Sequence, residues 1–200
     1  MTPPPKKHID SLLLASHNPG KIAELERMLA PLGISVTSAA DLDLPEVVEN
    51  KGTFRGNAEK KAAEIAAATG LPTLADDSGL CVDALGGNPG VFTKRYGTYE
   101  RLLKDMDTTP KGGRNAFFVC VLALAIPGQN TVFFEGNVSG TITPEPRGNG
   151  GFDYDPVFIP HGHNLTFAEM PVQEKQQYSH RGAALAKFKE HLREHLIQYV

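Results

Sequence analysis

Residues 74–80 read L-A-D-D-S-G-L and place two adjacent carboxylates, Asp76 and Asp77, directly after a short apolar run. A strand that runs into a Ser-Gly turn would bring these acids to a sheet end, where α/β folds bind ligands and metal ions. Neighbouring residues on a strand point to opposite faces, so we expect only one of the two to face a given pocket. Asp, Ser and Gly also form ordinary turns, and that alternative remains open for this segment alone.

The composition is that of an ordinary globular protein, since the 200-residue chain is 40% hydrophobic and 22% charged. This length predicts one domain over residues 9–200, preceded by a disordered extension over the Pro-rich residues 1–8. The start lacks the apolar stretch of a signal peptide, and the longest apolar run, residues 117–126, is too short to span a bilayer. We therefore expect no membrane partner.

The net charge and the cysteine content narrow the expected partners and the cellular compartment of the protein. A net charge of −3 argues against a protein that coats nucleic acid, so no nucleic-acid partner is expected. Cys81 and Cys120 are the only cysteines, and neither belongs to a C-x-x-C pair. This usage predicts a reduced, cytoplasmic protein rather than a disulfide framework.

The order of apolar segments predicts the fold class. Short strands are expected at residues 9–15, 34–37, 73–77, 81–84 and 154–159, and helices at 21–29, 53–69, 98–106 and 180–198. Two longer strands, residues 116–126 and 131–141, read as a hairpin. Thr53 and Gly70 suit the start and end of an Ala-rich helix, and residues 166–169 fit a capping box. Alternating helices and strands with one hairpin predict an α/β domain with a mixed central sheet flanked by helices.

Two lysine-bearing segments are suited to binding an anion. The first joins a strand to a helix and comprises Ser16, His17, Asn18, Pro19, Gly20 and Lys21. Backbone N–H groups at a helix N-terminus and the Lys21 charge suit a phosphate, although the P-loop pattern is absent and a plain connection is the alternative. The second pairs Asn57 with Lys61, four residues apart on one helix face, where Lys61 would reach a phosphate unless this face is simply solvated.

Acidic and aromatic segments add two further chemistries. The Asp76/Asp77 pair suits Mg²⁺, which proteins bind through one or two carboxylates while water and phosphate oxygens complete the octahedron. Phe152 or Tyr154, which follow two glycines, would stack on a flat base. His180 and Arg181 would donate hydrogen bonds to that base, although core aromatics beside a helix cap are the alternative. A nucleotide with a Mg²⁺-bound polyphosphate would satisfy all these chemistries together.

At this point the motifs identify a resemblance that covers nearly the whole chain. The segments that carry it are S-H-N-P-G-K at 16–21, F-R-G-N-A-E-K-K-A at 54–62, L-P-T-L-A-D-D-S-G-L-C-V-D-A-L-G-G-N-P-G-V at 71–91, G-G-F-D-Y-D-P-V-F at 150–158 and E-K-Q-Q-Y-S-H-R-G-A-A-L at 174–185. With these segments the chain resembles the inosine triphosphate pyrophosphatase family, also described as dITP/XTP pyrophosphatases. The D-D-S-G-L and S-H-R-G segments are the most specific.

The resemblance implies a mixed-sheet fold with two lobes around a nucleotide cleft, usually as a homodimer. It implies Mg²⁺-dependent hydrolysis of ITP, dITP and XTP to the monophosphate and pyrophosphate, which cleanses the nucleotide pool. By motif position, Asp77 would be the catalytic and metal-binding acid, Glu49 a second metal ligand, and Ser78 a substrate contact. The remaining substrate-binding residues would be Ser16, His17, Asn18, Pro19, Gly20, Lys21 and Lys61 for the triphosphate, and Phe152, Asp153, Tyr154, Asp155, Lys175, His180 and Arg181 for the base. Asn57 would also bind substrate.

Three positions depart from the family pattern. The family commonly has Gly at the position of Asp153, which here adds charge beside the base pocket, and often Glu at the position of Gly56. The loop after residues 94–97 is also shorter than usual. These departures bear on substrate preference and loop geometry more than on the class of reaction.

The mechanism expected from these residues is attack of water on the α-phosphorus. Lys21 and Lys61 would stabilise the leaving pyrophosphate, and whether Asp77 is the base or only a metal ligand assisted by Asp76 stays open. Donors from His180 or Arg181 would pair with the 6-keto group of the purine and be left unpaired by adenine. The alternatives are a pyrophosphatase for another modified nucleoside triphosphate and a nucleotide-binding regulator without turnover.

Overall fold

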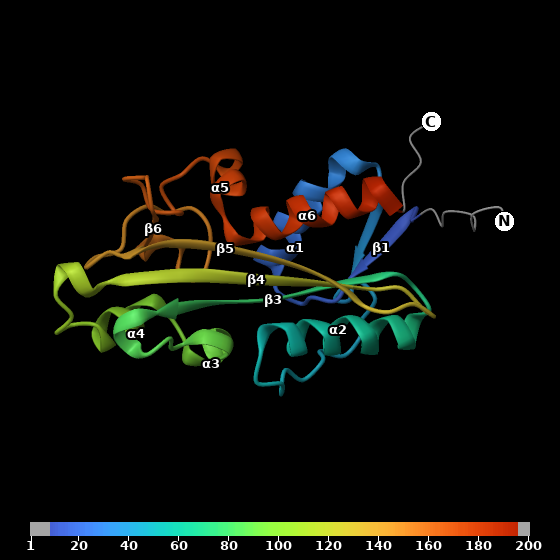
Figure 1. Ribbon diagram of the computed structural model, residues 1–200, viewed down its shortest axis with the longest axis horizontal. Coiled ribbons are helices and arrows are strands. Elements are labelled where there is room, and N and C mark those ends of the chain that lie inside the picture. The colour runs from blue at the N-terminus through green and yellow to red at the C-terminus, as the bar shows by residue number, and fades with distance from the viewer. Residues whose placement is uncertain (1–8, 196–200) are drawn as a thin grey trace.

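A six-stranded sheet in the order β2-β1-β3-β4-β5-β6 forms the centre of the molecule. Figure 1 shows the computed structural model, which describes residues 9–195. The strands are β1 (Ser11–Leu14), β2 (Ser35–Ser38), β3 (Thr73–Val82), β4 (Asn115–Ala125), β5 (Val132–Ile142) and β6 (Phe158–Pro160). β1 pairs in parallel with β2 and β3, and the other neighbours are antiparallel. The predicted mixed sheet is confirmed, whereas the expected extension over residues 1–8 lies outside the described residues.

Helices cover both faces of this sheet. They are α1 (Pro19–Leu29), α2 (Phe54–Thr69), α3 (Thr93–Tyr96), α4 (Tyr99–Asp105), α5 (Val172–Tyr178) and α6 (His180–His195). Figure 1 shows α1, α5 and α6 on one face and α2, α3 and α4 on the other. The end of the helix expected over 180–198 lies outside the described residues. Within residues 9–195, no helix is both long and apolar enough to cross a membrane.

Local signals in the sequence fix several helix ends. The Thr53 side chain accepts a hydrogen bond from Gly56 N at 3.0 Å, and Gly70 ends α2 in the left-handed conformation with φ of 71°. Both ends were predicted, and the physical reason is that these residues satisfy the unpaired groups of a helix terminus. The Glu169 carboxylate accepts from Thr166 N at 2.8 Å, as in a capping box, but only a turn follows.

The Ser-Gly turn predicted after the two aspartates is wrong. β3 runs without a break through Ser78 and Gly79, which pair with Cys120 and Val119 of β4. The ladder and the burial of β3 outweigh the local turn preference of Ser and Gly. A Cβ on Gly79 would lie 2.4 Å from the carbonyl oxygen of Gly90, so this glycine permits close packing of the segment that leads into α3.

The strand predicted over residues 154–159 is only partly correct. Residues Asp155–Val157 form a 3-10 turn, and β6 begins at Phe158. Pro156 lies in that turn, and a proline has no N–H to donate to a strand ladder.

The hydrophobic core is divided along the sheet. At one end, β1 and the sheet centre pack against α1 and α6 on one face and against α2 on the other, with Leu25, Phe188 and Ile65 among the buried side chains. At the other end a separate cluster includes Leu102 and Phe158. The long strands β3, β4 and β5 connect the two ends, which matches the expected two lobes.

The close approach at Gly79 gives a stability prediction. We expect Gly79→Ala to lower the free energy of unfolding by about 1–3 kcal/mol, because the added methyl group must displace the backbone at Gly90. Urea unfolding measures this. Gly112→Ala is the matched control, since a Cβ there meets no atom within 4 Å. Equal stability of the two variants would contradict the packing described here.

Candidate functional site

A cleft opens beside β3 at the point where β1 ends. β1 pairs with β3 only through Leu13 and Leu14, opposite Thr73 and Leu74. From Ala75 to Leu80, this edge of β3 therefore has no strand partner among residues 9–195, and an isolated bridge joins Cys81 to Pro89 beyond it. Side chains from both faces of β3 reach past the open edge into one cleft, which also receives residues from the β1–α1 connection, α2, α3, α5 and α6.

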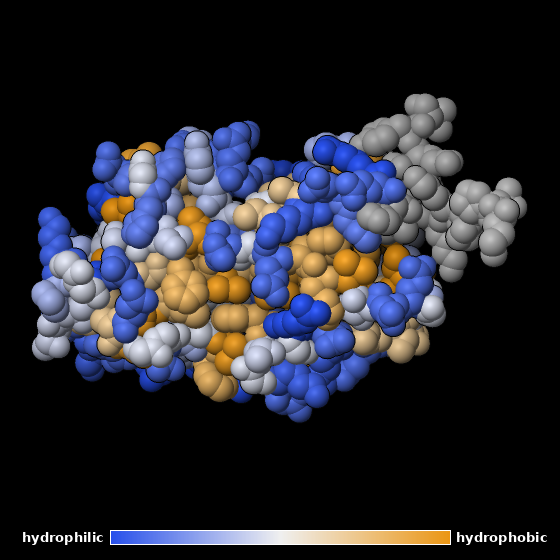
Figure 2. Space-filling view, viewed as in Figure 1, coloured by the Kyte–Doolittle hydropathy of each residue, from blue (hydrophilic) through white to orange (hydrophobic). Residues whose placement is uncertain are grey.

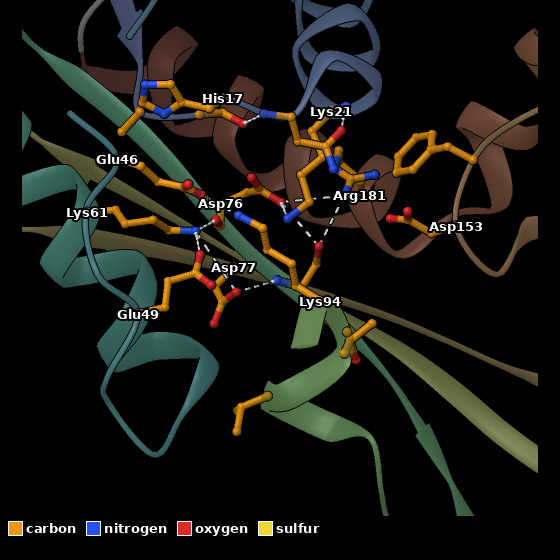
Figure 3. A pocket seen from close by; sticks show the side chains of 18 of the residues that line it. His17, Lys21, Glu46, Glu49, Lys61, Asp76, Asp77, Lys94, Asp153 and Arg181 are labelled. Atoms are coloured by element: carbon orange, nitrogen blue, oxygen red, sulfur yellow. Dashed lines mark hydrogen bonds and ion pairs between the residues drawn. The ribbon is translucent and has the colours of Figure 1, made fainter. Parts of the chain in front are cut away.

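The two adjacent aspartates lie on opposite faces of β3 but line the same cleft (Figure 3). Asp76 Oδ2 lies 2.9 Å from Lys21 Nζ and 3.4 Å from an Arg181 guanidinium nitrogen, on the α1/α6 side. Asp77 Oδ2 accepts a hydrogen bond from the Asn57 amide at 2.9 Å, on the α2 side. The alternation was predicted correctly. The expectation that only one acid would face the pocket is wrong, because β1 stops short and leaves the strand edge open.

Their different surroundings shift the pKa values of these two carboxylates in opposite directions. Burial alone would raise the pKa of Asp76, but the charges of Lys21, Arg181 and Lys61 outweigh it and hold that pKa well below its usual range. Burial raises the pKa of Asp77 to about 6, against the opposing effects of the Lys61 charge and the Asn57 hydrogen bond. Two neighbouring acids with such different environments are suited to two different roles.

Lys61 lies between the carboxylates of Glu49 and Asp77. Its Nζ is 2.5 Å from Glu49 Oε1 and 4.0 Å from Asp77 Oδ1, and it also donates to the main-chain oxygen of Asp76 at the open strand edge. Burial disfavours the charged form of Lys61, but the nearby carboxylates, Asp76 foremost, raise its pKa. In the described part of the chain, no group of three or more His, Cys, Asp or Glu residues is arranged to hold a metal ion.

Most of the predicted triphosphate residues line the cleft. Ser16, His17, Asn18 and Lys21 do so at the start of α1, together with Lys61 and Ser78. The Asn18 side chain caps α1 by accepting from Lys21 N at 3.1 Å, and His17 Nε2 lies 2.7 Å from the Leu44 carbonyl oxygen.

Three of the predicted residues do not line the cleft but support residues that do. Pro19 and Gly20 form the first turn of α1, and a Cβ on Gly20 would lie 2.8 Å from the Phe152 ring. Asn57 is buried and ties β3 and the segment before α2 to its own helix, α2. Its amide donates to Asp77 of β3, and its oxygen accepts from Lys51 N at 2.8 Å.

The predicted base-binding residues gather at the other end of the cleft. All of them line it, namely Phe152, Asp153, Tyr154, Asp155, Lys175, His180 and Arg181. Lys175 Nζ lies 2.7 Å from Asp155 Oδ2 and 4.8 Å from the centre of the Phe152 ring. His180 stacks on Phe118 with ring centres 4.6 Å apart.

Sequence reasoning missed Glu24, which links Lys175 to Arg181 at this end of the cleft. Its carboxylate lies 2.6 Å from Lys175 Nζ and accepts a hydrogen bond from Arg181. One signal was present, because Glu24 follows Lys21 by three residues and so shares its helix face. Sequence reasoning also missed the exposed ion pair between Glu46 and Lys94, both of which line the cleft. No local pattern indicates that pair, since its partners belong to distant segments.

His180 gives a prediction about the pH dependence of stability. Burial, followed by the charges of Arg181 and Lys175, lowers its pKa well below the ordinary value of 6.5. The unfolded chain therefore takes up a proton as the pH falls below that value while the folded protein does not, so stability is lost on acidification. Between about pH 7.5 and about pH 5.5, we expect the native chain to lose about 1 kcal/mol more than His180→Phe.

Urea unfolding of both proteins at both pH values measures this difference. Comparison with His180→Phe cancels the pH-dependent contributions of the other titrating groups to stability. Asp77 is one of them, and its raised pKa increases stability on acidification. Equal losses in the two proteins would show that His180 does not stay neutral in the fold.

Comparison with known proteins places the chain among related enzymes. The protein named dITP/XTP pyrophosphatase in Gluconobacter oxydans is 48% identical over 185 residues, which cover 88% of each chain. The Thermus thermophilus protein of the same name is 50% identical over 181 residues, or 87% of each chain. A solved HAM1 protein from Coxiella burnetii superposes with a TM-score of 0.82 at 40% identity and covers 92% of this chain and 98% of its own.

The family assignment follows from these matches. The Staphylococcus aureus Ham1 protein also superposes, with a TM-score of 0.80 at 32% identity, over 92% of this chain and 98% of its own. The model of the Ham1 family matches residues 12–191, which include all the motif segments described above. The chain therefore belongs to the Ham1 family.

Proposed function

We propose that this protein hydrolyses the non-standard purine nucleoside triphosphates ITP, dITP and XTP to the monophosphate and pyrophosphate. The observation that carries the proposal is the open edge of β3, which brings Asp76, Asp77, Lys21 and Lys61 into one cleft. The names of the Gluconobacter oxydans and Thermus thermophilus relatives, dITP/XTP pyrophosphatase, support two of these substrates, dITP and XTP.

The cationic side chains favour a triphosphate at the α1/α2 end of the cleft. Lys21 and Lys61 both present ammonium groups there, and Ser16 and Ser78 add hydroxyl groups. Cations preorganised around the phosphates stabilise the charge that develops on the leaving pyrophosphate. Asp76 holds Lys21 and Arg181 in place, because a buried carboxylate between two cations fixes the position of both.

We assign Asp77 as the general base that takes a proton from the attacking water. Its Oδ2 is held by Asn57, which leaves the carboxylate directed at the cleft. The water oxygen bonds to the α-phosphorus, the proton of that water passes to Asp77, and the bond from the α-phosphorus to the bridging oxygen breaks. The bridging oxygen leaves with pyrophosphate. A positioned carboxylate is suited to this proton transfer.

The same residues fit a Mg²⁺ ion. Glu49 and Asp77 both face one cationic centre, the ammonium group of Lys61, so two carboxylates already converge on a point where positive charge is stabilised. Mg²⁺ is commonly bound through one or two carboxylates and substrate phosphates. Glu49 and Asp77 would hold it, and when bound it would neutralise charge on the phosphate oxygens.

The far end of the cleft suits a 6-oxo purine. Two of its buried polar atoms, Arg181 Nε and His180 Nδ1, have no hydrogen-bond partner within residues 9–195. The other Arg181 nitrogens donate to Glu24, Asp76 and Ser78. Buried polar groups normally find partners, and the purine O6 would accept from a donor here, whereas the 6-amino group of adenine would leave it unpaired.

We also propose a homodimer. Figure 2 shows an apolar area over the middle of one face of the molecule. On the α2 side of the sheet, Phe117 is exposed, and Val119 and Phe133 are half-buried. Apolar surface of this kind is typical of an interface between subunits.

We propose, in addition, one domain over residues 9–200 and a cytoplasmic location. The six strands belong to one sheet, which supports the single domain. Cys81 and Cys120 are both buried and free, which supports a reducing compartment.

A substrate panel tests the proposed function. With Mg²⁺, we expect pyrophosphate release from ITP, dITP and XTP at a kcat/KM about 10⁴-fold above that for ATP, because adenine leaves the buried donors unpaired. A pyrophosphate-coupled assay measures this. Equal hydrolysis of ATP would overturn the assignment of the base end, and binding of these nucleotides without turnover would favour a regulator.

Replacement of Asp77 tests its role as the general base. We expect Asp77→Asn to lower kcat for ITP by about 10²–10⁴-fold, because the amide cannot take the proton of the attacking water. The fold should persist, since the amide oxygen still accepts from Asn57. Asp83→Asn is the matched control, because Asp83 is exposed, follows the same strand and lies outside the cleft. A fully active Asp77→Asn variant would remove Asp77 from the reaction.

A further inference from the structure

Asp153 is the carboxylate in the cleft that has no partner among residues 9–195. The other acidic residues that line the cleft are all engaged in ion pairs or hydrogen bonds, namely Glu46, Glu49, Asp76, Asp77 and Asp155. Among the residues that the structure describes, Asp153 contacts no cation and accepts no hydrogen bond. Its charge is therefore available to a ligand.

The backbone at Asp153 holds an uncommon conformation. Its φ is 53°, and within residues 9–195 only Asp43 among the other non-glycine residues has a positive φ. Residues other than Gly rarely adopt the left-handed backbone region, although Asp tolerates it better than most. Such strain persists where the surrounding structure enforces it, often at ligand sites. Here Asp155 Oδ2 accepts from Phe152 N at 2.7 Å and so helps to fix the turn.

The position of Asp153 complements the unpaired polar atoms of Arg181 and His180. Figure 3 shows the Asp153 carboxylate on the Arg181 side of the cleft, away from Glu49 and Asp77. Arg181 Nε and His180 Nδ1 are buried nitrogens without a hydrogen-bond partner among residues 9–195, and Asp153 is an acceptor in the same cleft that is likewise unpaired within these residues. A 6-oxo purine presents the matching edge, because its O6 accepts while the adjacent N1–H donates.

A carboxylate here distinguishes between two 6-oxo purines. Hypoxanthine is neutral near pH 7 and carries hydrogen at position 2. Xanthine carries a second oxo group there and is the more acidic base, so it acquires negative charge near neutral pH. Asp153 attracts the N1–H donor of hypoxanthine but repels an anionic base, and like charges placed together reduce affinity.

We propose that Asp153 is a specificity-determining residue that favours the hypoxanthine nucleotides ITP and dITP over XTP. This inference rests on the proposed function and refines it by naming the preferred base.

The test compares kcat/KM for ITP and XTP in the native chain, in Asp153→Asn and in Asp153→Gly. Asn keeps the shape of the side chain and tolerates a positive φ, and Gly removes the strain, so both variants retain the fold. We expect the ratio of ITP to XTP activity to fall about tenfold in both variants, because a charge-assisted hydrogen bond and a repulsion are both lost. Asp43→Asn is the matched control, since Asp43 has a φ of 51° and does not line the cleft.

Calorimetric binding of IMP and XMP gives a readout that does not need turnover. We expect Asp153→Asn to bind IMP more weakly and XMP more tightly than the native chain. If the variants change both affinities and both kcat/KM values equally, Asp153 has only a structural role and the inference is wrong. If no triphosphate is hydrolysed by the native chain, the proposed function is wrong, and the binding experiment still decides the role of Asp153.

Discussion

The early end of β1 is the constraint on which the site depends. Because β1 pairs with β3 only as far as Leu14, the next residues of β3 have one edge without a neighbouring strand. That edge exposes the main-chain oxygen of Asp76 to Lys61 and allows side chains from both faces of the strand to enter one cleft. A full-length β1 would have placed Asp76 and Asp77 in separate environments. A difference of a few residues in strand length therefore brings the two acids together.

Opposite charges then alternate through the buried end of the cleft. Lys21, Asp76, Arg181, Glu24, Lys175 and Asp155 form a continuous series of contacts. Buried charges of this kind add little net stability, because their desolvation offsets their attraction. Their effect is positional, since Arg181 and Lys175 each lie between two acids, and Asp76 and Glu24 each lie between two cations. The series connects β3 with α1, α5 and α6, so the elements that line the two ends of the cleft are fixed relative to one another.

Local patterns in the sequence predicted what local physics decides. The ends of α2 at Thr53 and Gly70, and the alternation of Asp76 and Asp77, needed only neighbouring residues. The turn expected after Asp77 was wrong because pairing with β4, a distant segment, decides the conformation there. Glu24 was missed for a similar reason, since its two partners are more than a hundred residues away in the chain. The pairing of Asp155 with Lys175, and the lack of a partner for Asp153 among residues 9–195, likewise follow from tertiary contacts alone.

The open edge of β3 also bears on how the protein avoids self-association. An unpaired strand edge is a template on which another chain can add a strand, the usual start of aggregation. Here charged side chains, Lys61 and Asp77 among them, surround that edge, and the segment before α3 packs on the rest of it through Gly79 and Gly90. A strand from another molecule would have to bury these charges in order to pair. The charged residues at this edge thus also hinder pairing with a second chain, so removal of their charge would leave an edge that is more open to misassembly.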